Sequence, residues 1–524
     1  MAVTDPDSIS FARAGARRRA GWWGLHGGID GTPGDGQVRA VGGRSLFWRK
    51  PIDAPAGGDA GPVGLRRVLG TGDLTLLGVG AIVGAGIFSS VGQMAAGTPG
   101  APGAGPALVV SYVITAVACG LAALCYAEIA ALIPVAGSAY SYAYAALGEI
   151  WAWIIGWDLV IEYAIGNVYV AQSWADYFRS FLVGAFGVDW PAWMATDLQT
   201  AAADPAIASA APHAFGHVIA FNLPAAAITA ILTVVLCVGI RESARLASAL
   251  VVFKLALIAV FVGVGAAYVK PAHWYPFAPG GWRGIWNGAS LAFFSYIGFD
   301  ALSTAAEETR QPQRSVPRAM IASLMICAVL YVAVAAVMTG LSPAAELAVG
   351  DPLARSLRGA GLDRMATAMS LGAVVAVTVV LLVFQMGQSR ILLAMARDGL
   401  LPGALARVHG RRRTPVVGTI VTGVFVAVTP TFLTPSQALE LTSIGTLFAF
   451  IVVAGGVIAL RVREPNRVRP FRCPGYPATP LLAIAACLTL MLGLPAANWW
   501  RFAVWLGIGL VFYGGARGRG RPPA

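Results

Sequence analysis

The sequence predicts an all-α integral membrane protein with twelve transmembrane helices. Of the 524 residues, 57% belong to the hydrophobic set and only 12% are charged, whereas an ordinary soluble domain carries about 25% charged residues. A helix needs about 20 apolar residues to cross the hydrocarbon layer, and roughly a dozen such runs follow one another along the chain. This balance excludes a soluble enzyme and makes the lipid bilayer the main solvent of the chain.

The predicted spans are apolar runs bounded by proline, glycine or charged residues. They cover residues 72–94, 105–133, 147–178, 216–240, 244–269, 283–308, 317–341, 364–396, 414–433, 437–460, 476–494 and 499–515. An even number of crossings places both chain ends on the same side of the membrane.

Positive charge lies mainly in the short connections between these runs. The chain has 37 Lys and Arg against 25 Asp and Glu, a net charge of +12. Basic connections are typical of the cytoplasmic side, so we expect both termini in the cytoplasm and no nucleic-acid partner. The exceptions on the predicted outer side are Lys270, Arg283, Arg355, Arg358 and Arg501.

The two chain ends differ in composition from the apolar runs. Residues 1–70 are polar and glycine-rich and lack the apolar h-region of a signal peptide. We expect a disordered cytoplasmic tail there; the alternative is an overlong start-site assignment, because folded-protein character begins only near Ser45. Residues 516–524 are expected to form a cytoplasmic C-terminal tail.

No residue set is typical of catalysis or metal binding. The 5 histidines lie in the tail or in loops, and no serine or cysteine stands in a nucleophile motif. Most of the cysteines fall inside apolar runs, where they pack as small hydrophobes. We therefore expect no catalytic residue, no metal, no cofactor and no disulfide.

Two predicted spans carry residues that interrupt helices. The first contains GVGAIVGAGIF, residues 78–88, and the sixth contains SYIGFDA, residues 295–301. Each glycine within a helix costs about 1 kcal/mol relative to alanine, and breaks at matching positions in two halves indicate a transporter binding site. The breaks therefore predict a first repeat over 71–269 and a second over 283–460, with 476–515 added. The alternative is a small-residue packing face.

Unwound backbone within a membrane has to line a cavity, because its polar groups otherwise stay unpaired. The half-helix that starts near Gly84 to Gly86 would present amide groups and a positive dipole end to a carboxylate. The carbonyls near Phe294, Ser295 and Ile297 would suit an ammonium group. Together these groups predict a receptor for a zwitterionic amino acid.

Lys254 lies in the middle of the fifth predicted span, SALVVFKLALIAVFVGVG. A charged side chain there costs about 2.5 to 3.5 kcal/mol on insertion scales, and such residues usually act in ion or proton pathways. We expect Lys254 to exchange a proton during transport and to replace a bound sodium ion. The alternatives are a snorkelling lysine and a purely structural tether to an unpaired carbonyl.

Several acidic residues lie within or at the ends of the spans. Glu162 and Asp158 are one turn apart in the third span, and Glu162 would pair with a cationic substrate or join a proton relay, or would be a structural acid. Near the inner end of the sixth span, a gate or a salt-bridge cluster is expected from Asp300, Glu307 and Glu308 beside Arg310 and Arg314, and a similar one is expected from Asp398 with Arg390 and Arg397.

The motifs of this chain resemble those of the amino acid–polyamine–organocation (APC) superfamily, specifically bacterial members of the cationic amino acid transporter family. The resemblance covers about residues 45–515 and rests on GVGAIVGAGIF, GWDLVIEY, SARLASALVVFKLALIAVFVGVG, SLAFFSYIGFDALSTAAEETRQPQRSVPRAM, GQSRILLAMARDGLLP and RVREPNRVRPFRCPG.

This resemblance implies a LeuT-type fold of ten core helices plus two, and exchange of amino acids by alternating access. It assigns the substrate's carboxylate and amine to Ile82, Gly84, Ala85 and Gly86 in the first helix and to Phe294, Ser295 and Ile297 in the sixth. Phe294 would cover the site from outside, Lys254 would occupy a sodium position and couple to protons, and Glu162 would bear on cationic substrates.

The resulting hypothesis is a proton-coupled amino acid importer of a bacterial inner membrane. The first alternative is a non-transporting membrane sensor that keeps the binding site. The second is a carrier of polyamines or other organic cations, in which the carboxylate-binding amides would have no partner. Whether a small membrane accessory subunit binds is left open.

Overall fold

The computed structural model describes residues 46–51, 69–98, 100–133, 138–239, 244–300, 302–303, 309–410 and 414–518. Residues 1–45 and 52–68 of the predicted N-terminal tail and residues 519–524 of the C-terminal tail lie outside this part of the chain. Residues 46–51 pack on the helices: the amides of Ile150 and Glu149 donate to the carbonyls of Leu46 and Trp48, both at 3.0 Å.

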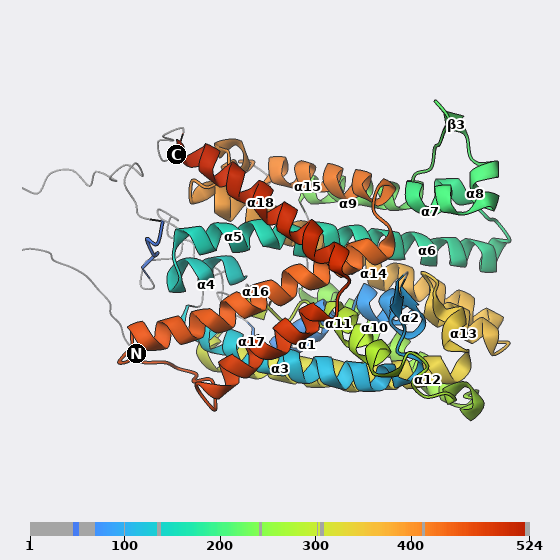
Figure 1. Cartoon of the computed structure of the whole chain (residues 1–524), viewed down its shortest axis with the longest axis horizontal. Helices are drawn as coiled ribbons and strands as arrows, with labels where there is room; N and C mark the ends of the chain where they lie inside the picture. The colour runs from blue at the N-terminus through green and yellow to red at the C-terminus, as the bar shows by residue number, and fades with distance from the viewer. Residues whose placement is uncertain are drawn as a thin grey trace, which may run out of the picture. The chain divides into compact units, whose positions relative to one another are not determined.

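Helices make up most of the described chain, and every predicted span contains one or more of them (Figure 1). The first half comprises α1 (Thr71–Ile82), η1 (Gly86–Ser90), α2 (Val91–Ala96), α3 (Leu108–Leu132), α4 (Ser138–Ala146), α5 (Glu149–Val160), η3 (Ile161–Ile165), α6 (Gly166–Phe186), α7 (Leu198–Ala203), α8 (Pro205–Ala210), α9 (Leu223–Val238) and α10 (Ala244–Ala266). The second half comprises α11 (Gly281–Tyr296), α12 (Pro312–Leu341), α13 (Pro352–Gly359), α14 (Asp363–Arg397), α15 (Val416–Val428), α16 (Pro435–Arg463), α17 (Ala478–Leu492) and α18 (Ala496–Gly518).

The strands of the described residues form two small antiparallel hairpins. Strand β1 (Gly97–Thr98) pairs with β2 (Ala101–Pro102), and β3 (His213–Ala214) pairs with β4 (His217–Val218). The sequence interpretation did not predict these hairpins, nor α4, α7, α8 and α13, because each of these elements is too short to contain an apolar run that could cross the bilayer.

Six helices in the described residues are long and apolar enough to cross a membrane. The number rises to at most eight if each of two bent pairs is counted as one span: α1 with the η1–α2 segment, bent by 45°, and α17 with α18, bent by 114°. Helices α9 and α15 are apolar but shorter, and α11 has 16 residues. The chain is therefore a multi-pass membrane protein in which several predicted spans are short or broken helices.

The contacts between the long helices follow a regular pattern. Helix α3 packs along α12, α5–α6 along α14, and α9 along α15. Helix α1 contacts α12 and α10, while α11 contacts α3 and α16. Helix α10 contacts α12 and α14, while α16 contacts α3 and α6. The broken helix α1 thus packs between α12 and α10, and the broken helix α11 packs between α3 and α16.

Candidate functional site

The first span breaks directly after α1. Val83 has an extended conformation (φ −72°, ψ 99°), and a turn of wider, π-type helix begins at Gly86. The next closed turn starts where the amides of Ile87 and Phe88 donate to the Gly84 carbonyl, at 3.1 and 3.3 Å. The amides of residues 84–86 therefore stand at a helix start, where backbone donors have no partner within the helix.

The sixth span breaks after α11. Ile297 is extended (φ −59°, ψ 139°), and Gly298 has φ +118°, a conformation that side-chain-bearing residues rarely adopt. The Gly298 amide donates to Oδ1 of Asp300 at 3.3 Å. Both breaks occur where the sequence predicted them.

The two breaks cross each other with their backbones in close contact. A Cβ atom at Gly86 would lie 2.4 Å from Cα of Ser295, and one at Gly298 would lie 2.8 Å from the carbonyl oxygen of Ala81. The sequence predicts either unwinding or small-residue packing for these glycines, and Gly86 and Gly298 serve both roles. Gly86 leaves room for the α11 backbone, and Gly298 also supplies the left-handed turn.

Two side chains from other helices form hydrogen bonds with the backbone carbonyls at the first break. Lys254 of α10 is 1% exposed, and its Nζ donates to the carbonyls of Gly80 and Val83, both at 3.2 Å. The hydroxyl of Tyr331 in α12 lies 2.9 Å from the carbonyl of Ile82 and 2.8 Å from that of Ser295. Tyr331 thus contacts the ends of both broken helices.

Tyr331 is a residue that the sequence interpretation missed. It is a lone tyrosine in the apolar run CAVLYVAVAAV, and a buried tyrosine hydroxyl usually finds a partner. This rule could have indicated from the sequence that Tyr331 has a polar partner within the bundle. The single O–H of Tyr331 can donate to only one of these two carbonyls at a time, so the Ser295 carbonyl, expected to receive a substrate ammonium group, shares this donor with the Ile82 carbonyl.

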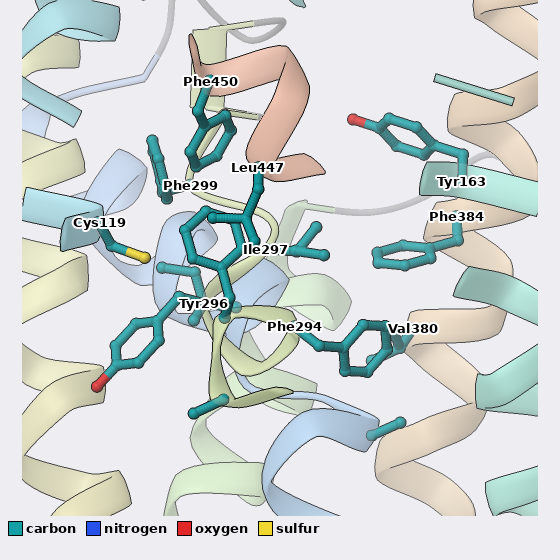
Figure 2. Packing of buried hydrophobic residues seen from close by; sticks show 14 of the residues in the cluster. Cys119, Tyr163, Phe294, Tyr296, Ile297, Phe299, Val380, Phe384, Leu447 and Phe450 are labelled. Atoms are coloured by element: carbon teal, nitrogen blue, oxygen red, sulfur yellow. The ribbon is translucent and has the colours of Figure 1, made fainter. Parts of the chain in front are cut away.

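The side chains around the crossing are mainly apolar. Figure 2 shows Ile297 and Phe384 pointing toward one another, with Phe294 beside Val380. Val380 also faces Gly84, where a Cβ atom would lie 3.0 Å from its Cγ2. Because these side chains surround the predicted amide and carbonyl groups, a ligand side chain held here would meet hydrocarbon.

A cavity of about 150 Å³ lies beside the crossing. Its lining residues are Ser89, Gln93, Tyr169, Ser173, Asp176, Ala348, Val349, Gly350 and Pro435. The ring of Tyr169 packs edge-on against Phe294, with centroids 5.1 Å apart. Tyr169 therefore lines this polar cavity and also packs against Phe294 of the sixth span.

Glu162 lies in a buried acidic cluster. Glu162 and Asp158 are 2% and 0% exposed, and Oε1 of Glu162 and both carboxylate oxygens of Asp158 have no hydrogen-bond partner in the described residues. Asp300 lies close to Glu162 and accepts hydrogen bonds from Ser138 and Tyr163, each at 3.2 Å. None of the three carboxylates forms an ion pair within the described part of the chain.

The ion-pair partners predicted for Asp300 and Asp398 were wrong, while Glu307 and Glu308 of the first predicted cluster lie outside the described residues. Asp300 lies two residues after Gly298 at the break, where it is buried and accepts hydrogen bonds from the hydroxyls of Ser138 and Tyr163 and from the Gly298 amide. Asp398 bonds to Lys50, at 3.1 Å, and to the Tyr140 hydroxyl, at 2.8 Å. Lys50 is distant in sequence, so local charge patterns could not reveal it.

Comparison with known proteins gives a consistent result. The family described as Amino acid permease matches residues 69–512. The branched-chain amino acid permease BcaP of Bacillus subtilis is 44% identical over 90% of this chain and 97% of its own length. The methylthioribose transporter of the same organism is 41% identical over the same shares. Cationic amino acid transporter 9 of Arabidopsis thaliana, a chloroplastic protein, is 36% identical over 76% of this chain and 67% of its own length.

Proposed function

This chain belongs to the amino acid permease family of the APC superfamily, and we propose that it is a secondary active transporter that imports amino acids together with protons. The membrane is a bacterial inner membrane, with both termini in the cytoplasm. The observation that carries the proposal is the crossing of two broken helices, where amides at a helix start lie beside the apolar side chains of Phe294, Ile297 and Phe384.

The fold proposed for this function is the LeuT type, with residues 71–269 and 283–460 as inverted repeats and 476–515 as two further helices. The helix contacts support it. When the five spans α1–α2, α3, α5–α6, α9 and α10 are matched with α11, α12, α14, α15 and α16, the contacts of α1 with α12 and α10 correspond to those of α11 with α3 and α16. Short or broken spans at a central site are typical of such transporters.

The proposed substrate is a neutral amino acid with a branched apolar side chain. Its carboxylate would bind the amides of residues 84–86, with Ile82 at the end of α1, and its ammonium group would bind carbonyls at Phe294, Ser295 and Ile297. The apolar surroundings in Figure 2 favour a hydrocarbon side chain. A relative that covers most of this chain carries the name branched-chain amino acid permease.

Cationic amino acids are a second candidate substrate class. The specific observation that favours them is Oε1 of Glu162, a buried carboxylate oxygen without a partner in the described residues. A cationic substrate side chain that reached it would gain a charge-assisted hydrogen bond. Without such a ligand, the acidic cluster has no cation near it among the described side chains.

Uptake of labelled amino acids into proteoliposomes tests the proposed function. With an alkaline interior, leucine, isoleucine and valine are expected to accumulate above the outside concentration, and dissipating the pH gradient is expected to abolish the accumulation. Agmatine, which lacks a carboxylate, is expected not to compete. Binding without uptake would support the sensor, and accumulation of agmatine would support an organic-cation carrier; either result contradicts the proposal.

Glu162→Gln is expected to separate the two substrate classes. If Glu162 pairs with a cationic side chain, the variant should lower the affinity for arginine at least about tenfold, while the affinity for leucine stays within about twofold, because only the charged partner loses a charge-assisted bond. Ligand-induced thermal stabilisation measures both affinities in one variant. Equal losses for both amino acids would make Glu162 a structural acid.

A further inference from the structure

A groove of about 360 Å³ opens between the start of α11 and the end of α17. Its lining residues are Trp282, Arg283, Trp286, Asn287, Leu492 and Gly493. None of these residues takes part in the proposed transport site. The groove lies where α17 ends and the chain bends by 114° into α18.

Exposed aromatic side chains indicate the depth of this groove in the membrane. Tyr268, Trp274, Tyr275 and Phe277 in the connection before α11 are exposed, and Trp282 is 64% exposed. Amphipathic aromatic rings concentrate at the level of the lipid headgroups. Leu492 at the other edge of the groove is 72% exposed, as expected for a side chain in contact with acyl chains. The groove therefore reaches from the headgroup level into the hydrocarbon layer.

Contacts beneath the groove hold its shape. The indole N–H of Trp286 donates to the carbonyl of Thr489 at 3.0 Å, and the Ser290 hydroxyl donates to that of Leu490 at 2.7 Å. A Cβ atom at Gly493 would lie 2.8 Å from Cδ1 of Trp286. The two hydrogen bonds join α11 to α17, and Gly493 leaves room for the Trp286 ring, so the groove is a built feature of the helix pair.

Two polar groups of the groove, the Arg283 guanidinium and Oδ1 of Asn287, lack an ion-pair or hydrogen-bond partner among the described residues. Arg283 is exposed and forms no ion pair with any described residue, unlike Arg355 and Arg358, which pair with Glu346 and Asp351. The Asn287 amide donates to the Pro102 carbonyl at 3.1 Å, but Oδ1 of Asn287 is buried without a partner. The start of α11 has no side-chain cap and adds the positive end of a 16-residue helix.

We propose that this groove binds a glycerophospholipid, with its phosphate at Arg283 and the first turn of α11. A hydroxyl or ammonium group of the headgroup donates to Oδ1 of Asn287, and one acyl chain lies along Trp282 and Leu492. A guanidinium group together with helix-start amides suits a phosphate, and the apolar edge distinguishes a lipid from a free anion. The proposal does not depend on the transported substrate.

Melting temperatures of the purified, delipidated full chain in detergent test this site. Dioleoyl phosphatidylglycerol is expected to raise the melting temperature of the wild type by at least about 2 °C at saturation, because it binds the folded state. Dioleoylglycerol, which lacks the phosphate, and glycerol phosphate, which lacks the chains, are expected to leave it unchanged. Arg283→Gln should lose the shift in melting temperature. Lys270→Gln, which removes an exposed cation from the connection before α11, should keep the shift.

Native mass spectrometry provides a second readout that is independent of melting. Wild type and Lys270→Gln are expected to retain one more phospholipid per chain than Arg283→Gln. An equal shift with glycerol phosphate would indicate a simple anion site, and an equal shift with dioleoylglycerol would indicate an apolar groove without phosphate recognition. Either result, or a full lipid shift in Arg283→Gln, overturns the proposal.

Discussion

Gly86→Ala is expected to abolish uptake and to destabilise the protein, although it adds a single methyl group. The new Cβ would lie 2.4 Å from Cα of Ser295, and a backbone atom cannot rotate away as a side chain can. The α1–η1 break and α11 must then move apart, and such overpacking typically costs about 1–3 kcal/mol. Leucine uptake in proteoliposomes and the melting temperature of the purified chain measure the two effects.

The matched control for this variant is Gly120→Ala in α3. No atom lies within 4 Å of a Cβ at Gly120, and alanine favours a helix over glycine, so uptake and stability should be retained. Wild-type uptake by Gly86→Ala beside this control would mean that the two breaks are not packed as described. The proposed amide site would then have to be moved.

The long helices could be predicted from the sequence because a helix that crosses the membrane needs a run of about 20 apolar residues. Apolar runs such as 105–133 and 437–460 became α3 and α16 with ends shifted by a few residues. Residues 216–240 and 283–308 began or ended elsewhere, since the β3–β4 hairpin occupies the start of one and the break after Tyr296 ends the other. Hydropathy gives the number of apolar runs but not where a helix unwinds within one.

The breaks themselves were predictable, whereas their partners were not. Glycines 84, 86 and 298 mark positions where helix is costly, and all three lie at or beside a break. The contacts that close the site come from residues far away in sequence, such as Tyr331 and Lys254. Glu128 likewise gave no hint of a partner, and it pairs with Arg461 at 2.6 Å, across more than 300 residues. Such pairs follow from the packing of the helices.

The hydrogen bonds of Lys254 bear on both hypotheses for this residue, the structural tether and proton coupling. Its two acceptors, the carbonyls of Gly80 and Val83, are in the last turn of α1 and at the break. A neutral amine still donates hydrogen bonds, but it holds carbonyl oxygens more weakly than an ammonium group does. Loss of a proton from Lys254 would therefore loosen the end of α1 next to the proposed substrate amides.

Lys254→Met is accordingly expected to abolish proton-driven accumulation of leucine and to lower stability. Removal of the ammonium leaves two buried carbonyls without their donor, at about 1–3 kcal/mol each. Lys254→Arg keeps donors and charge, so leucine binding should partly survive, but a guanidinium does not deprotonate in proteins and accumulation should fall at least about tenfold. The measurement is leucine accumulation with an alkaline interior, beside ligand-induced thermal stabilisation of both variants. Accumulation by Lys254→Arg at the wild-type rate would show that lysine titration is not the coupling step, and Lys254 would then act only as the tether of α1.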